Sequence, residues 1–316
     1  MFDSLRDLLR PRARAGLAFS DHTIRMVVFR GNAGDLTHLQ YWEDELAADI
    51  VQGGKIVDEE AFVSTLKEIV HAIGARGRRV SLAIPETQLI LRKFELPGLM
   101  NDSDLRNYFF VEMGKKVQLP FEQAVFDFQT IMQGAAGTKV ILYAAPEPVV
   151  RQYQRVLRAA GLEPVSAEFA SLGLERWLQH HQPELKQQHR LYVQLESDRV
   201  VATIFDRDIP LFVRQVNLAR SSGETEENDR MINAADEVER MVDFYRYSLQ
   251  EGEAGLSNVY LLDCRRRAAS FTGILSDALS LPVQPVTFDS ERTALPDDLD
   301  PVFIPEIGLA MKEVRG

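Results

Sequence analysis

The chain has 316 residues, of which 45% are hydrophobic and 26% are charged, a balance typical of a globular protein with one large core or two lobes. Its formal net charge of -11 excludes nucleic acid as a partner, because that binding depends on Lys and Arg that neutralise phosphates. The single cysteine, Cys264, excludes an internal disulfide framework and indicates a reducing compartment. No apolar run approaches the roughly 20 residues that span a bilayer, and no signal peptide is visible, so we expect a cytoplasmic protein.

Residues 1–15 predict a short amphipathic arm. Phe2, Leu5, Leu8 and Leu9 would share one face of a helix, and arginines lie among and after them. This pattern fits peripheral association with an anionic membrane surface. It also fits a solvated chain terminus, because chain ends are often frayed. The arm is too short to hold a membrane alone, so both alternatives stay open.

The next 170 or so residues predict one lobe with an insertion. Strands and tight turns form a meander over 16–42, with a turn at 31–35, and Asp58 caps the helix that follows. We assign residues 16–80 and 166–188 to the first lobe and residues 81–165 to an inserted α+β subdomain. The further elements expected in this part of the chain are strands at 80–85, 90–94, 127–130 and 140–145 and helices at 103–117, 147–160 and 167–182.

A polar stretch at 182–189 marks the boundary to a second lobe, residues 189–316. This lobe is expected to contain strands from 190 to 216, an acidic loop at 221–229, a helix with apolar positions from 231 to 245, a strand at 258–262, a helix at 268–278 and a C-terminal segment at 307–314.

Each lobe opens on the same pattern, repeated at an offset of 176 residues. Leu17–Thr23 leads into Ile24–Phe29, and Val193–Arg199 leads into Val200–Phe205. Each copy is an apolar strand, a polar turn and a second strand that ends in Phe. Such a duplicated hairpin is typical of actin-like ATPases, in which the two turns hold Asp and Gly around a nucleotide.

Short segments spread over the chain resemble the PilM family, actin-like cytoplasmic proteins of type IV pilus assembly that are related to the cell-division protein FtsA. The resemblance implies an α/β, actin-like (ribonuclease H-like) two-lobe fold with an inserted α+β subdomain. It also implies a reduced fourth subdomain, left as a vestige around 217–230. The segments that carry it are 80–85 with Leu96-Pro97, 119–122 with 126–129, 144–146 with 159–165, 238–245 and 307–310.

The nucleotide-binding positions that the resemblance implies have changed. The family's first phosphate loop reads Asp-x-Gly-Ser-Ser-Ser, its second reads Asp-x-Gly-Ala, and a Gly-Gly pair lies against the adenosine. The residues at these positions are Ala18, Ser20, Asp21, His22 and Thr23 in the first loop, Gln194, Glu196 and Ser197 in the second, and Asp263, Cys264 and Arg265 at the glycine pair.

These changes predict that binding of magnesium-ATP is lost. Glycine lets backbone amides approach a phosphate closely, and the loop Asp residues position the metal. Glu196 would instead place a carboxylate beside a polyanion, at a cost of about 1 kcal/mol in water and about 4 kcal/mol at an effective dielectric near 20. Asp21 would add a like repulsion. We therefore expect a pseudo-ATPase with no catalytic residue, no cofactor and no metal.

Other candidate sites are weaker. His180, His181 and His189 lack the spacing of a zinc site and are expected in a solvated linker. Cys264 has no catalytic partner nearby in sequence and is expected to be an inert buried thiol.

Our functional prediction is a non-catalytic scaffold on the inner face of the cytoplasmic membrane. The resemblance implies that it binds the N-terminal cytoplasmic tail of a PilN-like membrane protein in a groove with walls from 16–80, 81–165 and 166–188. It further implies coupling to a pilus motor ATPase or a platform protein. The alternatives are an ATP-binding switch, a component of a type II secretion or DNA-uptake platform, and an FtsA-like tether that polymerises.

Overall fold

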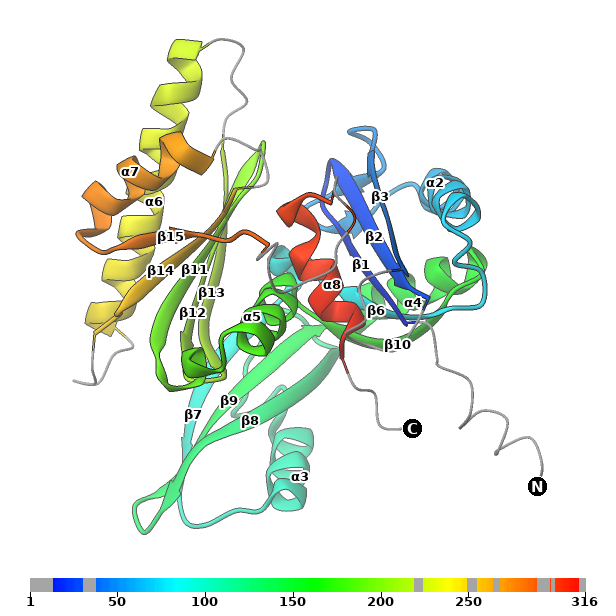
Figure 1. Cartoon of the computed structure of the whole chain (residues 1–316). Coiled ribbons are helices and arrows are strands. Elements are labelled where there is room, and N and C mark those ends of the chain that lie inside the picture. Colours follow the sequence, from blue (N-terminus) through cyan, green and yellow to red (C-terminus); the bar gives the residue numbers. More distant parts are fainter. Residues whose placement is uncertain are drawn as a thin grey trace.

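The computed structural model describes residues 14–30, 38–218, 224–248, 255–263, 268–288, 296 and 299–312. Within them, two five-stranded sheets with the same strand order form the two lobes (Figure 1). The first has the order β3-β2-β1-β6-β10 and the second β13-β12-β11-β14-β15. In each sheet the first three strands are antiparallel and the next two run parallel to the first. The strands are β1 (Arg14–Phe19), β2 (Thr23–Phe29), β3 (Leu39–Glu45), β6 (Arg79–Ala83), β10 (Glu163–Glu168), β11 (His189–Leu195), β12 (Arg199–Asp206), β13 (Ile209–Asn217), β14 (Asn258–Asp263) and β15 (Val283–Pro285).

The predicted duplication is confirmed in register as well as in order. Leu17 pairs with Met26 across the first hairpin, and Val193 pairs with Ala202 across the second, 176 residues later in both strands. The second hairpin's strands are buried over nearly their whole length because both faces of the sheet are covered. The α/β actin-like fold predicted from the sequence is therefore what the chain adopts.

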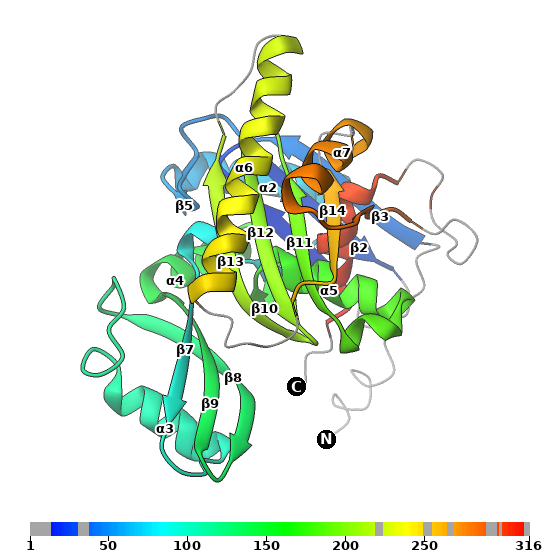
Figure 2. The same ribbon diagram turned by 90° about the vertical axis from the view of Figure 1, so that its left-hand side faces the viewer.

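Helices cover the outer face of each sheet and fill the space between them (Figures 1 and 2). The first sheet packs on its outer side against α2 (Glu59–Ala72) and α4 (Glu147–Ala159), and Asp58 caps α2 through the Ala61 amide at 2.9 Å. The second packs against α6 (Glu224–Ser248) and α7 (Ala268–Leu279). Between the sheets lie α5 (Ala170–His181) and α8 (Ile304–Ala310).

The two inner helices touch backbone to backbone at a pair of glycines. A Cβ at Gly308 would lie 1.8 Å from the carbonyl oxygen of Gly173, and a Cβ at Gly173 would lie 2.2 Å from that of Pro305. No side chain fits at such a contact. The lobes are therefore joined at a close helix crossing that depends on these two glycines.

A three-stranded sheet with the order β7-β9-β8 forms the inserted subdomain. Its strands are β7 (Ile90–Leu96), β8 (Ala124–Gly134) and β9 (Gly137–Pro146), and α3 (Asp102–Glu112) covers one face. Phe109 is buried at the centre of this separate core, against Phe94 and Phe126. Because β6 and β10 are strands of the first sheet and α4 packs on that sheet, the subdomain with its own core is narrower than the predicted 81–165.

Several predicted boundaries were wrong. The region 221–229 was expected to be an acidic loop, but residues 224–229 already belong to α6. The described residues of the segment around 217–230 are therefore the end of β13, Leu218 and the start of a helix. The helix expected at 103–117 ends at Glu112, where the backbone turns to form a bridge between Met113 and Val117. Strand β10 and the small hairpin of β4 (Val51–Gln52) and β5 (Lys55–Ile56) were not predicted. Short 3-10 turns occur at Glu86–Gln88, Pro183–Gln187 and Pro301–Phe303.

Most of the predicted arm (residues 1–13), the turn at 31–35, Cys264 and Arg265 lie outside the described residues. Arg14 and Ala15, assigned to the arm, begin β1. None of the described helices is long and apolar enough to cross a membrane.

Candidate functional site

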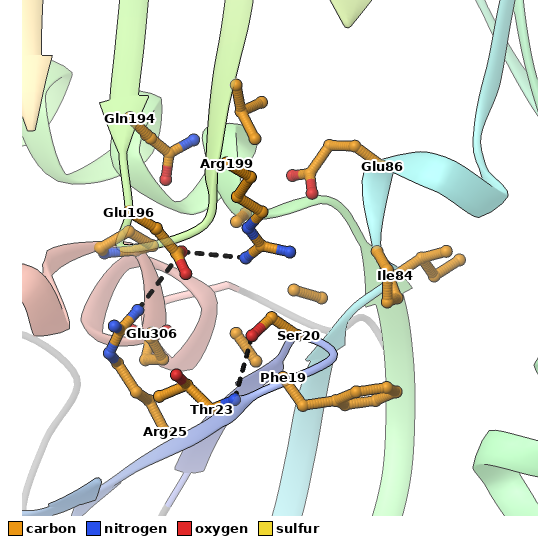
Figure 3. A pocket seen from close by; sticks show the side chains of 16 residues that line it. Phe19, Ser20, Thr23, Arg25, Ile84, Glu86, Gln194, Glu196, Arg199 and Glu306 are labelled. Atoms are coloured by element: carbon orange, nitrogen blue, oxygen red, sulfur yellow. Dashed lines mark hydrogen bonds and ion pairs between the residues drawn. The ribbon is translucent and has the colours of Figure 1, made fainter. Parts of the chain in front are cut away.

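The turns of the two duplicated hairpins face one another across the space between the lobes, which we call the cleft (Figure 3). This is where an actin-like protein would hold a nucleotide. The free volume left in the cleft is about 20 Å³, which is room for one water molecule. Its principal polar lining residues are Ser20, Arg25, Glu86, Glu196, Arg199 and Glu306.

The first turn, between β1 and β2, is closed by its own side chain. The Ser20 hydroxyl accepts hydrogen bonds from the amides of His22 at 3.2 Å and Thr23 at 3.0 Å. These amides are therefore occupied within the turn. Asp21 was expected to repel a bound nucleotide, but its carboxylate faces away from the cleft and accepts the amides of Gly53 at 2.7 Å and Gly54 at 2.8 Å.

The second turn, between β11 and β12, is hydrogen-bonded to Arg230 on α6. Arg230 donates to the carbonyl oxygen of Glu196 at 3.0 Å and to that of Ser197. Gln194, at the position of the family's loop Asp, is buried and donates to Ser171 at 2.8 Å. The Gln194 side chain thus contacts α5 between the sheets, and the backbone of the turn is bonded to α6.

Ion pairs join the two lobes across the cleft. The Glu196 carboxylate lies 2.9 Å from Arg199 on its own hairpin and 3.5 Å from Arg25 on the other (Figure 3). Arg25 also pairs with Glu43 at 2.6 Å. A second contact links the turns themselves, between His22 Nε2 and Asp198 Oδ2 at 3.3 Å. Arg25 and Arg199 both line the cleft.

The electrostatics of the cleft favour an ionised Glu196. Burial alone would raise its pKa, but Arg199 and Arg25 outweigh that effect and lower the pKa to about 2. Burial lowers the pKa of Arg199, yet Glu196 and Glu86 together raise it well above its ordinary value. These opposite charges are therefore permanently paired at neutral pH.

Two further carboxylates line the cleft without such partners. Within the described residues, Glu86 Oε1 and Glu306 Oε2 are buried and accept no hydrogen bond. Burial raises the pKa of both groups, and that of Glu306 rises to about 7 because the attraction of Arg25 does not compensate. Glu196 is therefore kept ionised by its arginine partners, whereas burial favours the protonated forms of Glu86 and Glu306.

The structure brings together only part of the predicted site. Ala18, Ser20, Gln194 and Glu196 line the cleft, whereas Asp21 does not. Asp263 is buried at the end of β14, outside the lining of the cleft. Sequence reasoning missed Arg25, Arg199, Glu86 and Glu306. The available signal was an arginine on each of the second hairpin strands β2 and β12, which are otherwise mostly apolar.

The three histidines of the predicted linker lie in different surroundings. His189 was expected in a solvated linker, but it is buried on β11 with its ring 3.0 Å from the Tyr245 hydroxyl. His181 contacts the Trp177 carbonyl at 2.9 Å. Across the described ranges, no group of three or more His, Cys, Asp or Glu residues is placed to hold a metal ion.

A much larger space, which we call the groove, lies between the first lobe and the inserted subdomain. Its volume is about 510 Å³. One wall is the sheet face that includes Val125, Asp127 and Tyr143, on the opposite side of the sheet from α3. The other includes Phe169 and Leu172 where β10 leads into α5, with Ile84 and Val150 nearby. This groove overlaps the predicted partner site in part: its lining comes from 81–165 and 166–188 and, in the second lobe, from Pro210 and Lys312, with no lining residue from 16–80.

The groove combines apolar walls with a few charges and two exposed sheet edges. Glu168 is held between Arg176 at 2.9 Å and Lys312 at 3.0 Å, and Asp127 lies on the facing sheet. Strands β8 and β10 are edge strands of their sheets, so their outer backbone groups are available to an added strand. Such a space suits an extended peptide.

Comparison with solved structures gives the class of protein. A chain of a PilM–PilN type IV pilus biogenesis complex has a TM-score of 0.78 at 21% identity, over 97% of this chain and 100% of that one. The cytoplasmic domain of EpsL, an inner membrane component of the type II secretion system of Vibrio cholerae, has a TM-score of 0.52 at 13% identity, over 95% of both chains. ADP-bound MreB5 of Spiroplasma citri has 0.51 at 10%, over 94% of this chain and 95% of that one. The chain thus has an actin-like fold.

The family follows from the sequence itself. The profile of the family described as type IV pilus assembly protein PilM matches residues 16–218, which is more than half of the chain. This chain belongs to that PilM family. No curated protein sequence matches it.

Proposed function

We propose that this protein is a non-catalytic adaptor of a type IV pilus assembly platform. It binds the short cytoplasmic tail of a PilN-like membrane protein in the groove, and that contact brings it to the inner face of the cytoplasmic membrane. The observation that carries the proposal is the contrast between a cleft with about 20 Å³ of free volume and a groove with about 510 Å³.

The closed cleft supports the absence of ATPase activity. A nucleotide would have to displace Arg25 and Arg199 from Glu196 and separate the turn contact between His22 and Asp198. It could not use the amides of His22 and Thr23 in the first turn, because Ser20 already accepts both of them. The energy of phosphate binding would thus be opposed by the loss of buried ion pairs.

The groove supports peptide binding. An extended tail can add backbone hydrogen bonds at the edge of β8 or β10 and place apolar side chains against the groove walls. The PilM–PilN complex among the similar structures supports the identity of the partner. From this position the adaptor would couple the membrane protein to a motor ATPase or platform protein.

Nucleotide binding is tested by thermal denaturation with and without millimolar magnesium-ATP. A site with ligand at 100 times its Kd would stabilise the fold by about 2.7 kcal/mol, which is a clear rise in melting temperature. We expect no rise. A rise, or turnover of ATP, would favour the alternative of a nucleotide switch.

Partner binding is tested by titrating the full chain with a synthetic cytoplasmic tail of a PilN-like protein from the same organism. Val125→Arg, in the groove wall, should weaken binding at least about 10-fold, which corresponds to about 1.4 kcal/mol. Met132→Arg is a matched control on the same strand, because Met132 is exposed and lies outside the groove lining. Equal binding by the wild type and Val125→Arg would contradict the groove as the binding site.

A further inference from the structure

Arginines gather at one end of the first lobe, a surface that the proposed function does not use. Strands β1 and β6 begin at this end, β2 ends there, and α2 and α4 end beside them on the outer side of the sheet (Figure 1). The turns that follow the two helices are joined, because Gly77 donates to the Gly161 carbonyl at 2.7 Å. We call this surface the arginine patch, and its members are Arg14, Arg30, Arg76, Arg78, Arg79 and Arg158.

The members of the arginine patch come together from separate elements. Arg14 and Arg79 are partners in the register of β1 and β6. The Arg30 guanidinium reaches the end of α2, since a Cβ on Gly74 would lie 2.9 Å from its Nη2 atom, and Arg158 lies in the last turn of α4. Attraction to the negative ends of the helix dipoles accounts for these last two arginines, but it does not require the other four.

The charges of the arginine patch are not neutralised by neighbouring carboxylates. Within the described residues, none of the six arginines forms an ion pair, and Glu163 lies next to the patch without pairing with it. By contrast, Arg151 and Arg155 on the same helix α4 pair with Glu147 and Glu59. The whole chain has a formal net charge of -11, so an unpaired cluster of arginines is a local exception to its charge balance. Such a surface suits an anionic partner.

We propose that the arginine patch binds directly to the anionic headgroups of a membrane surface. Each basic residue held near such a surface strengthens binding roughly 5-fold. The sequence that leads into the patch at Arg14 favours a membrane over an acidic protein as the partner. Residues 1–13 combine three arginines with the apolar residues Phe2, Leu5, Leu8 and Leu9. Lipids offer both an anionic surface and an apolar interior to such a combination, whereas an acidic protein segment offers only the charge.

Membrane contact at the arginine patch would set the distance between the membrane and the groove. Strand β10 begins beside the patch at Glu163 and ends at the groove, where Ala167 and Glu168 belong to the lining. Five steps of about 3.3 Å along this strand place the groove roughly 17 Å from the patch. If the proposed function is correct, the tail of the membrane protein crosses this distance with about five extended residues. Only this spacing rests on the proposed function, because lipid binding by the patch requires no tail.

The test is co-sedimentation of the full chain with lipid vesicles in the absence of any tail peptide. Vesicles of phosphatidylcholine that contain about 30% phosphatidylglycerol are compared with vesicles of pure phosphatidylcholine, at about 0.1 M salt. We expect the chain to bind the anionic vesicles and not the neutral ones. Binding should weaken at least about 10-fold when the salt is raised to about 0.5 M, because the charges are then screened.

Charge reversal within the arginine patch identifies the surface that binds. The double variant Arg76→Glu and Arg158→Glu changes two exposed members of the patch and should weaken vesicle binding at least about 10-fold. Arg240→Glu with Arg246→Glu is the matched control, because it changes the net charge equally at two exposed arginines of α6 and should bind as the wild type does. An unchanged melting temperature and unchanged tail binding would show that the patch variant keeps its fold and its groove.

Several outcomes would overturn the proposal. These are a wild-type chain that does not bind anionic vesicles, equal binding to both kinds of vesicle, and an equal loss of binding in the patch variant and the control. Undiminished binding by the patch variant would overturn it as well, because residues 1–13 alone would then account for membrane binding. If the wild type bound a synthetic polyglutamate peptide but no vesicles, and the patch variant bound neither, the patch would be a site for an acidic protein segment and the membrane assignment would be wrong.

Discussion

The cleft and the groove are both spaces between structural units, yet they are filled in opposite ways. Side chains from both hairpins meet in the cleft, where Glu196 pairs with Arg25 and Arg199. The groove is walled by apolar side chains and sheet edges and stays open. The proposed loss of the ligand site between the lobes would leave the fold intact, because both sheets pack on α5 and α8. Interlobe contacts take over the role of holding the lobes together.

The largest loss of stability is expected from a substitution that forces the lobes apart at the crossing of α5 and α8. Gly308→Val places side-chain atoms where a Cβ alone would lie 1.8 Å from the Gly173 carbonyl. We expect a loss of at least about 4 kcal/mol in the free energy of unfolding, measured with urea. Gly273→Ala is the control, since a Cβ at Gly273 meets nothing within 4 Å and should be neutral or slightly stabilising.

Removing the negative charge of Glu196 at the centre of the cleft should cause the next largest loss of stability. Glu196→Gln leaves Arg199 and Arg25 without their shared partner, and we expect it to cost about 3 kcal/mol at neutral pH. The folded-state pKa of Glu196 is lowered to about 2 from 4.5, so its contribution is present above pH 4.5 and is lost as the pH falls toward 2.

The difference in unfolding free energy between wild type and Glu196→Gln should therefore narrow in acid. Urea denaturation at a series of pH values measures it. A difference that stays constant from neutral pH down to about 3 would show that the carboxylate acts through packing and not through its charge.

The contribution of Glu306 to the free energy of unfolding should change with pH in the opposite direction to that of Glu196. The folded-state pKa of Glu306 is raised to about 7 from 4.5, so the folded state holds a proton that the unfolded chain releases. The contribution of this proton to the stability of the folded state is complete below pH 4.5 and is lost as the pH rises through 7. Glu306→Gln should accordingly be neutral near pH 4.5 and stabilising by roughly 2 kcal/mol near pH 8.

Thermal or urea denaturation at both pH values checks this prediction. Glu68→Gln on the exposed face of α2 is the control and should change stability by less than about 0.5 kcal/mol at either pH. If Glu306→Gln destabilised the protein at pH 8, the buried carboxylate would have a partner that its surroundings do not show.

The smallest effect should come from the contact between the two turns. His22 and Asp198 lie 3.3 Å apart and are partly exposed, at 28% and 16% of their side chains. A double-mutant cycle with His22→Ala and Asp198→Ala should give a coupling of about 0.5 kcal/mol that weakens in high salt. A coupling energy well above that value would contradict the prediction and would show that the contact between the turns contributes substantially to holding the lobes together.

Much of the fold could be predicted because it depends on local patterns. The repeated hairpins were visible from alternating apolar strands and polar turns, and α2 was visible from the Asp58 cap and its apolar spacing. The short strand β10 was missed, because its pattern is weak and its strand conformation depends on pairing with β6. For the same reason, the limits of the inserted subdomain could be seen only once the sheets were assembled.

By itself, the sequence determined that the nucleotide loops lack their glycines and Asp residues, since residue identity at each loop position is a local fact. Only the tertiary structure decided what replaced them. Arg25, Glu86 and Glu306 are distant from Glu196 along the chain and come together when the two sheets pack around α5 and α8. Burial and pairing then set their pKa values, and these effects depend on distances in space that no local pattern encodes.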